Sequence, residues 1–247
     1  MLGALIVAVV MCWSAGASAA DLSLPGVDIE IKRGAGKPQE VATAIQILIA
    51  LTVLSLAPAI LIVMTSFTRI IIVLAMLRHA FGMPETPPNT VLVSLALFLT
   101  LFTMLPVFTQ ANDAALKPYL DGKLQLNRAL DLGLKPARDF MIRQTREQDL
   151  MLMIEVSKSE APATVDEIKT AHLIPAFMLS ELKTAFQIGF VIFLPFLLLD
   201  IVVASILMSM GMLMVPPMMI SLPLKVLMFV LIDGWSLVVK SVLGSFQ

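Results

Sequence analysis

The sequence predicts an all-α, membrane-derived protein built from two apolar helical hairpins with a segment of amphipathic helices between them. Hydrophobic residues make up 58% of the 247-residue chain and charged residues only 14%. The mean hydropathy of +0.93 lies far above that of a soluble domain. The net charge of −1 argues against nucleic-acid binding, which needs a clustered basic face.

The first 20 residues have the pattern of a secretory signal peptide. An apolar run is followed by an Ala-Ser-Ala motif, which predicts cleavage after Ala19 or Ala20. No Lys or Arg precedes the apolar run, so an uncleaved membrane anchor is the alternative. The only cysteine, Cys12, lies in this leader, which leaves no thiol for a disulfide or a metal site in the processed chain. Residues 21–40 are rich in Gly, Pro and charge, and we expect a flexible segment there.

Two long uncharged stretches within residues 41–111 predict the first hairpin. One stretch of about 28 residues follows Glu40 and one of about 27 follows Glu85, and a spanning helix needs roughly 20. We expect the connection between the two helices to contain Arg69, Arg78 and His79. By the positive-inside rule these charges predict that the connection is cytoplasmic.

Residues 112–172 have the composition of an aqueous domain, and we expect an extracytoplasmic domain of amphipathic helices. Pro136 suits the first turn of a helix that carries Phe140 and Arg143. The apolar residues of this segment need partners. Helices packed on each other or on neighbouring subunits account for them better than a ligand site.

Residues 173–247 predict a second apolar hairpin that contains several charges. These are Glu181, Lys183, Asp200, Lys225, Asp233 and Lys240. Charges in apolar segments are costly unless they are paired or lie in a polar cavity, so they are functional candidates. An antiparallel hairpin that turns near residues 212–217 would bring Asp200 level with Lys225, and Glu181 level with Lys240, as ion pairs. Contact of each charge with a neighbouring subunit is the alternative.

A methionine cluster, broken by a glycine and closed by two prolines, lies where the second hairpin turns. Its members are Met208, Met210, Gly211, Met212, Met214, Pro216 and Pro217. Methionine is unbranched and polarizable, so several together form an apolar surface that closes tightly and still changes shape. The cluster therefore suggests a soft seal, with plain packing as the alternative. The prolines end or bend the preceding helix.

The sequence does not indicate an enzyme. Only two histidines are present, and there is no nucleotide-binding glycine loop and no paired-histidine zinc motif, so no cofactor or metal is predicted. An intramembrane aspartyl protease would use Asp200 and Asp233, but the Gly-x-Gly-Asp motif of that class is missing. A secondary transporter or proton channel using Asp200 and Glu181 is the alternative function, although no internal repeat supports it.

Several motifs together point to one family. They are residues 175–190, Pro195-Phe196, Asp200, the methionine run with Pro216-Pro217, Thr68-Arg69-Ile70, Arg78 with Phe81-Gly82, the 143–146 helix, and Asp233-Gly234-Trp235. With these motifs the chain resembles the FliP family of the flagellar type III export apparatus. The resemblance covers nearly everything after about Val41, and the cleavable leader is more similar to the flagellar than to the injectisome branch.

The resemblance implies a helical multisubunit pore. In this family a pentameric set of chains joins FliQ and FliR, with FlhA and FlhB as further subunits, at the inner membrane and its periplasmic face in the flagellar basal body. Unfolded flagellar proteins pass through this gate. Hydropathy alone predicts four spanning helices, whereas the family's gate is implied to lie largely above the bilayer plane.

The resemblance also implies roles for particular residues. Met208, Met210, Met212 and Met214 correspond to a methionine gasket, and Gly211, Pro216 and Pro217 to the turn of the gate. Glu181, Lys183, Asp200, Lys225 and Asp233 correspond to buried charges or subunit contacts. Phe140 and Arg143 correspond to positions used in oligomer assembly.

Overall fold

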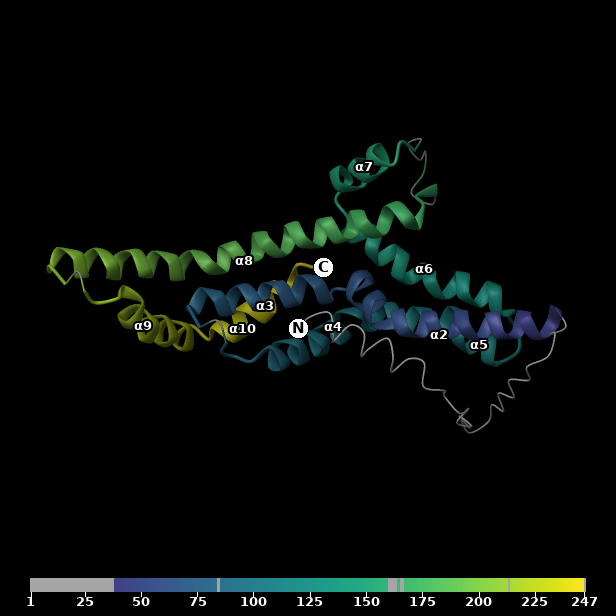
Figure 1. Ribbon diagram of the computed structural model, residues 1–247, viewed down its shortest axis with the longest axis horizontal. Coiled ribbons are helices and arrows are strands. Elements are labelled where there is room, and N and C mark those ends of the chain that lie inside the picture. The colour runs from purple at the N-terminus through teal and green to yellow at the C-terminus, as the bar shows by residue number, and fades with distance from the viewer. Residues whose placement is uncertain (1–37, 84, 160–163, 165–166, 213, 247) are drawn as a thin grey trace, which may run out of the picture. The chain divides into compact units, whose positions relative to one another are not determined.

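The computed structural model describes residues 38–83, 85–159, 164, 167–212 and 214–246, and every regular element among them is a helix (Figure 1). The predicted leader and most of the predicted flexible segment lie outside the described residues. The chain divides into two compact units, Met1–Leu54 and Ser55–Gln247. Helix α2 (Pro38–Met64) begins in the first unit and ends in the second, and all other described elements belong to the second. The all-α prediction is confirmed.

The connection expected to contain Arg69, Arg78 and His79 is itself a helix, α3 (Phe67–Phe81). All three residues lie on α3, with Arg69 buried and His79 exposed. The remaining residues of α3 carry an apolar face at helical spacing, which explains why the charges do not interrupt it. Gly82, with a φ of 79°, caps the helix in the left-handed conformation.

A long helical run follows, made of α4 (Asn89–Ala111), the π-helical turn η1 (Asn112–Leu116) and α5 (Lys117–Leu120). The chain then turns into α6 (Leu126–Gln144), which packs on α4 and η1. Pro136 lies inside α6 and not in its first turn, because the amphipathic pattern already starts at Leu126. α7 (Glu147–Val156) follows after a short break.

The second hairpin consists of α8 (Thr170–Ser209), α9 (Pro217–Leu231) and α10 (Gly234–Gly244). Among the described residues, Asn89–Leu120 and Thr170–Ser209 are long and apolar enough to cross a membrane. α9 and α10 form a third candidate span that is bent by 68°. The fourth span predicted from hydropathy rests on α2, where only the shorter stretch Ile45–Leu56 qualifies as an apolar helix.

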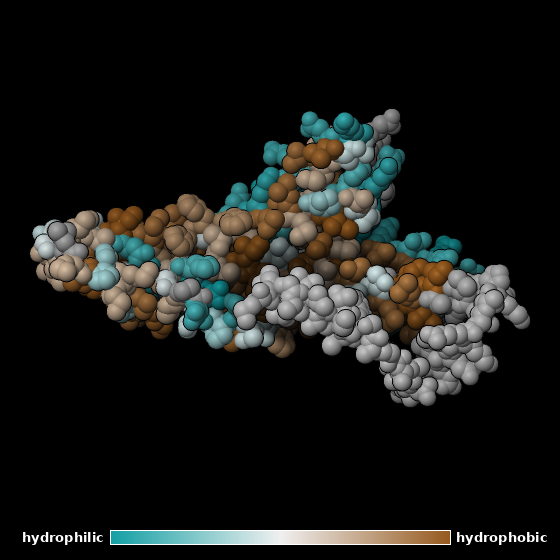
Figure 2. All heavy atoms as spheres, in the orientation of Figure 1, coloured by the Kyte–Doolittle hydropathy of each residue, from teal (hydrophilic) through white to brown (hydrophobic). Residues whose placement is uncertain are grey.

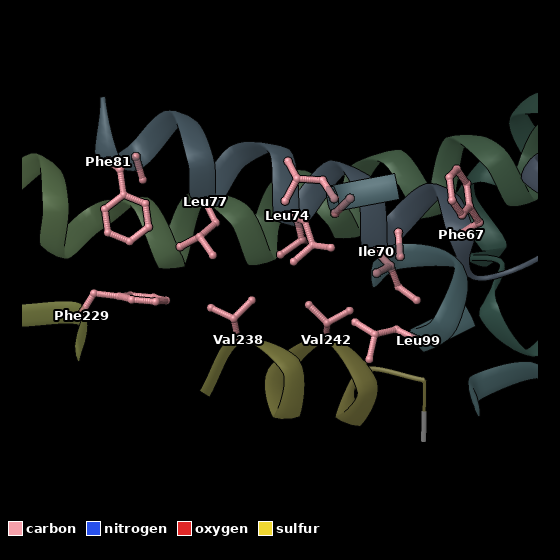
Figure 3. Packing of buried hydrophobic residues seen from close by; sticks show 14 of the residues in the cluster. Phe67, Ile70, Leu74, Leu77, Phe81, Leu99, Phe229, Val238 and Val242 are labelled. Atoms are coloured by element: carbon pink, nitrogen blue, oxygen red, sulfur yellow. The ribbon is translucent and has the colours of Figure 1, made fainter. Parts of the chain in front are cut away.

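The main core of the second unit lies between α3 and the helices that cover it. Figure 3 shows Ile70, Leu74 and Leu77 of α3 facing Val238 and Val242 of α10. At the end of this core the rings of Phe81, Phe196 and Phe229 meet edge to face or tilted, with the centroids of Phe81 and Phe229 4.9 Å apart.

Helices α3 and α8 run side by side (Figure 1), and Gly189 of α8 lies against α3. A Cβ atom placed on Gly189 would overlap the side chain of Met76. The absence of a side chain at this position therefore permits the contact between the two helices.

Hydrophilic and hydrophobic residues are unevenly distributed over the second unit. Figure 2 shows hydrophilic residues gathered over α7, whereas hydrophobic residues cover much of α8. Large apolar side chains of α8 and α9 are exposed, among them Phe190, Leu198, Leu227 and Leu231. Such a continuous apolar surface requires lipid or other protein chains to cover it.

Candidate functional site

The methionine cluster forms the tip of the hairpin between α8 and α9. α8 ends at Ser209, and Gly211 has a φ of 72°, a conformation that glycine adopts without strain. α9 then begins at Pro217, whose fixed φ suits the first turn of a helix. The turn predicted from Gly211 and the two prolines is therefore present.

All four predicted gasket methionines are exposed in the single chain. The exposed fraction is 61% for Met208, 67% for Met210, 39% for Met212 and 97% for Met214. Side chains with this exposure do not serve the core of their own chain. The tip therefore presents an exposed apolar surface made of flexible, unbranched side chains.

Lys225 joins three helices just inside this tip. Its ammonium group lies 2.6 Å from the Asp200 carboxylate of α8, and it donates a second hydrogen bond of 3.0 Å to the carbonyl of Ala80 in the last turn of α3. The Lys225 side chain is buried, while Asp200 keeps partial contact with the surroundings. The ion pair predicted from the level positions of Asp200 and Lys225 is thus present in the structure.

Glu181 pairs with Arg69 and not, as predicted, with Lys240. The guanidinium of Arg69 donates to both carboxylate oxygens of Glu181, at 2.8 and 2.5 Å, and both side chains are almost fully buried. The prediction assumed a straight hairpin, but the bend between α9 and α10 directs α10 onto α3 and leaves Lys240 exposed. A bidentate geometry is the strongest arrangement for an arginine and a carboxylate.

The same arginine binds two further segments. It donates hydrogen bonds to the side-chain carbonyl of Gln144 at the end of α6 (3.0 Å) and to the carbonyl and hydroxyl oxygens of Ser245 beyond α10 (2.8 and 2.9 Å). Arg69 therefore connects α3, α6, α8 and the C-terminal end of the chain. A buried guanidinium needs this number of acceptors to offset its loss of water.

A second polar cluster attaches α7 to α8. The buried carboxylate of Asp149 accepts hydrogen bonds from the hydroxyl of Ser180 (2.8 Å) and from the ammonium of Lys183. The hydroxyl of Ser180 in turn accepts the backbone N–H of Arg146 (2.9 Å). Burial by itself would raise the pKa of Asp149, but the bonds from Lys183 and Ser180 and the charges of Lys183 and Arg146 hold that pKa below its usual value.

Two of the predicted buried charges are not buried. Asp233 is exposed, with a φ of 50°, and it begins the bend at which the ring of Phe229 lies against Gly234. Lys183 is about half exposed, although its ammonium binds the buried carboxylate of Asp149. In both cases the apolar sequence around the charge suggested burial, whereas the charge lies at an edge of the fold.

The two residues predicted to act in assembly have different positions. Phe140 is buried inside the chain, with its ring centroid 6.0 Å from that of Phe177, and Arg143 is exposed on α6. Their role in oligomer assembly stays a prediction.

Sequence reasoning missed Arg69 and Asp149 as members of polar clusters, and Gln144 and Ser245 as their partners. The signal for Arg69 was its position on a face of otherwise apolar residues, where a lone charge must have a partner. Asp149 carried no such signal, since Glu147 and Glu155 nearby are equally acidic and exposed. Within the described residues, no group of three His, Cys, Asp or Glu side chains is arranged to hold a metal ion.

These features define an α-helical membrane protein in which a hairpin with an exposed methionine tip is fixed to a polar core by buried ion pairs. A profile of the FliP family matches residues 50–242. The chain belongs to the FliP family. Membership assigns it a role in flagellar biosynthesis and export, a membrane location, and an association with the flagellar export apparatus.

Individual relatives agree with this assignment. The chain is 52% identical over 209 residues to the flagellar biosynthetic protein FliP of Bacillus subtilis, a match that covers 85% of this chain and 95% of the relative. It is 49% identical over 229 residues to the protein of the same name from Caulobacter vibrioides, covering 93% and 85%. For that of Aquifex aeolicus the identity is 46% over 221 residues, covering 89% and 91%.

Proposed function

We propose that this chain is a pore-forming core subunit of the flagellar protein export gate, and that its methionine tip seals the pore. The observation that carries the proposal is the exposure of Met208, Met210, Met212 and Met214 at the end of an apolar hairpin. Several copies of the chain, with FliQ and FliR, would surround the path of unfolded flagellar proteins and bring these tips together at its centre.

The chemistry of the tip suits a seal that a polypeptide can open. Ions lose their hydration shell in an apolar constriction, so a ring of methionines resists them. A polypeptide that passes through can push the methionine side chains aside by rotation about their single bonds. The side chains then return and close the constriction behind it. No catalytic step is involved, and the energy for export would come from other subunits of the apparatus, FlhA and FlhB included.

The exposed apolar surface of α8 and α9 supports assembly with further chains. Within one chain only 17% of the most apolar part of α8 is buried. Copies of the same chain, FliQ and FliR, or lipid would cover the rest, at the inner membrane and on its periplasmic side.

The transporter alternative depends on carboxylates that take up and release ions. Glu181 is fully buried against Arg69, and Asp200 is paired with Lys225. Both carboxylates thus have a cation of the same chain as their partner, an arrangement typical of a structural role, and this supports the gate over the transporter.

Replacement of Met210, Met212 and Met214 together by alanine tests the proposal in cells that assemble the apparatus. We expect leakage of small ions, because alanine leaves the constriction open, while flagellin is still exported. Leucine at the same three positions is the matched control and should leak much less, since it keeps the apolar volume. Tight membranes and unchanged export in the alanine variant would contradict the proposed seal.

A further inference from the structure

The last residues of the chain are bound in a specific site of the core. Ser245 and Phe246 follow α10, and Arg69 donates two hydrogen bonds to Ser245, to its carbonyl and to its hydroxyl oxygen. Gln144 donates a further bond of 3.3 Å to the carbonyl of Phe246. The tail is therefore held by α3 and α6, two helices distant from it in the sequence.

The tail completes the hydrogen bonding of Arg69. A guanidinium has five N–H donors. Glu181 accepts two of the bonds, Gln144 one and Ser245 two, so Ser245 supplies two of the acceptors that a buried arginine needs. If the tail leaves, two N–H groups in the core lose their partners.

The ring of Phe246 adds an apolar contact to these polar ones. It lies flat beneath the guanidinium of Arg69, 3.9 Å from carbon to ring centroid, and stacks near Phe140 at 6.3 Å. Phe246 also continues the inner face of α10, since Val238, Val242 and Phe246 follow at intervals of four residues. A cation placed over an aromatic ring away from water is a favourable contact of substantial size.

The tail is one of two polar attachments of α9 and α10 to the rest of the unit among the described residues. The other is Lys225, which binds Asp200 and Ala80. The bend at Asp233 lies between the two points. Without the tail, α10 would be held by apolar contacts, those of Val238 and Val242 and of the partly buried Val239 and Leu243.

We propose that Ser245-Phe246 is a latch: its binding to Arg69 holds α10 on the core and thereby keeps the methionine tip in the position in which it seals. This inference rests on the proposed gate function. Release of the latch leaves Lys225 as the remaining polar attachment of α9 and α10 among the described residues, and lets the hairpin shift. Arg69 binds Glu181 through its Nε and Nη2 atoms and Ser245 through Nη1, so release of the tail breaks none of the bonds of the ion pair.

Phe246→Ala tests the latch without a change to Arg69. In the purified gate complex we expect amide hydrogen exchange in α10 to become roughly tenfold faster, as expected for the loss of a desolvated cation–π contact, while exchange in α3 stays the same. Phe246→Leu keeps the apolar volume but not the ring and should have a smaller effect. Phe98→Ala, at an exposed phenylalanine of α4, is the matched control and should leave α10 unchanged. Unchanged exchange in α10 of the Phe246→Ala variant would overturn the latch.

Ion leakage in cells then separates the latch from the seal. We expect Phe246→Ala to leak, though less than the triple methionine variant. Faster exchange in α10 together with a tight membrane would refute the effect of the latch on the gate, while leakage in the methionine variant would still support the seal. If the methionine variant does not leak, the gate proposal itself fails, and the exchange data still show whether the tail holds α10.

Discussion

The two halves of α8 belong to one continuous helix but have opposite surroundings. Seven of its ten buried residues lie in residues 170–189 and only three in residues 190–209. The first half is covered by α3, α6 and α7, and its charges find partners within the chain. The second half presents apolar side chains, such as Phe190 and Leu198, to its surroundings. Folding of the single chain thus covers the first half of α8, whereas the apolar side chains of the second half need other chains or lipid to cover them.

The largest effect on stability is expected when the buried ion pair in the first half of α8 is removed. Arg69→Ala leaves the Glu181 carboxylate buried without a cation, which should cost about 3–5 kcal/mol of the free energy of unfolding. Thermal unfolding in detergent and the amount of protein in the membrane measure this loss. Lys117→Ala, which breaks an exposed ion pair with Asp113, should change neither value. Equal stability of the two variants would contradict the central role of the Arg69 cluster.

A smaller effect on stability is expected at Lys225, which binds Asp200 in the second half of α8. Lys225→Ala leaves the Ala80 carbonyl and the Asp200 carboxylate without a donor and should cost about 1–3 kcal/mol. Asp200→Asn should cost less, because this side chain is partly exposed. A double-mutant cycle between the two positions measures their coupling. A coupling energy of zero would show that the contact does not stabilise the hairpin.

Asp149 should make the attachment of α7 sensitive to acid. Since its folded pKa is lowered, its contribution to stability is fully present above its unfolded pKa of about 4 and is lost as the pH falls through the folded pKa. Asp149→Asn should cost about 1 kcal/mol at neutral pH, a modest value because Lys183 is half exposed. The Tm of the wild type should fall toward that of this variant below about pH 4. Parallel Tm curves over the whole acid range would argue against the assignment.

The smallest effect on stability is expected in the second half of α8, whose apolar side chains are exposed. Phe190→Ser removes an exposed ring and should change the stability of the single chain by less than about 0.5 kcal/mol. It should nevertheless reduce the recovery of assembled complexes on native gels. Phe177→Ser, at a buried ring of the first half, should instead destabilise the chain before assembly. Normal assembly of the Phe190 variant would mean that lipid and not protein covers this face.

The sequence allowed the helical class, the hairpin turn and the pairing of Asp200 with Lys225 to be predicted, because each depends on local spacing. The partner of Glu181 was not predictable in this way, since Arg69 lies 112 positions away. The same holds for Ser245, which reaches Arg69 only because the chain bends at Asp233. The α3 helix was not foreseen for another reason: its charges resemble those that flank a membrane span. Of these charges Arg69 is buried, and its partners lie far away in the sequence.

The glycine at position 189 has a geometric consequence for the whole hairpin. It lies against Met76 of α3, and α8 continues for 20 residues from there to Ser209, a length of about 30 Å. A side chain that forced the two helices apart would tilt this arm, and a tilt of about 5° moves its far end by about 3 Å. The position of the methionine tip is therefore set, in part, by the absence of a side chain at a residue about 30 Å away.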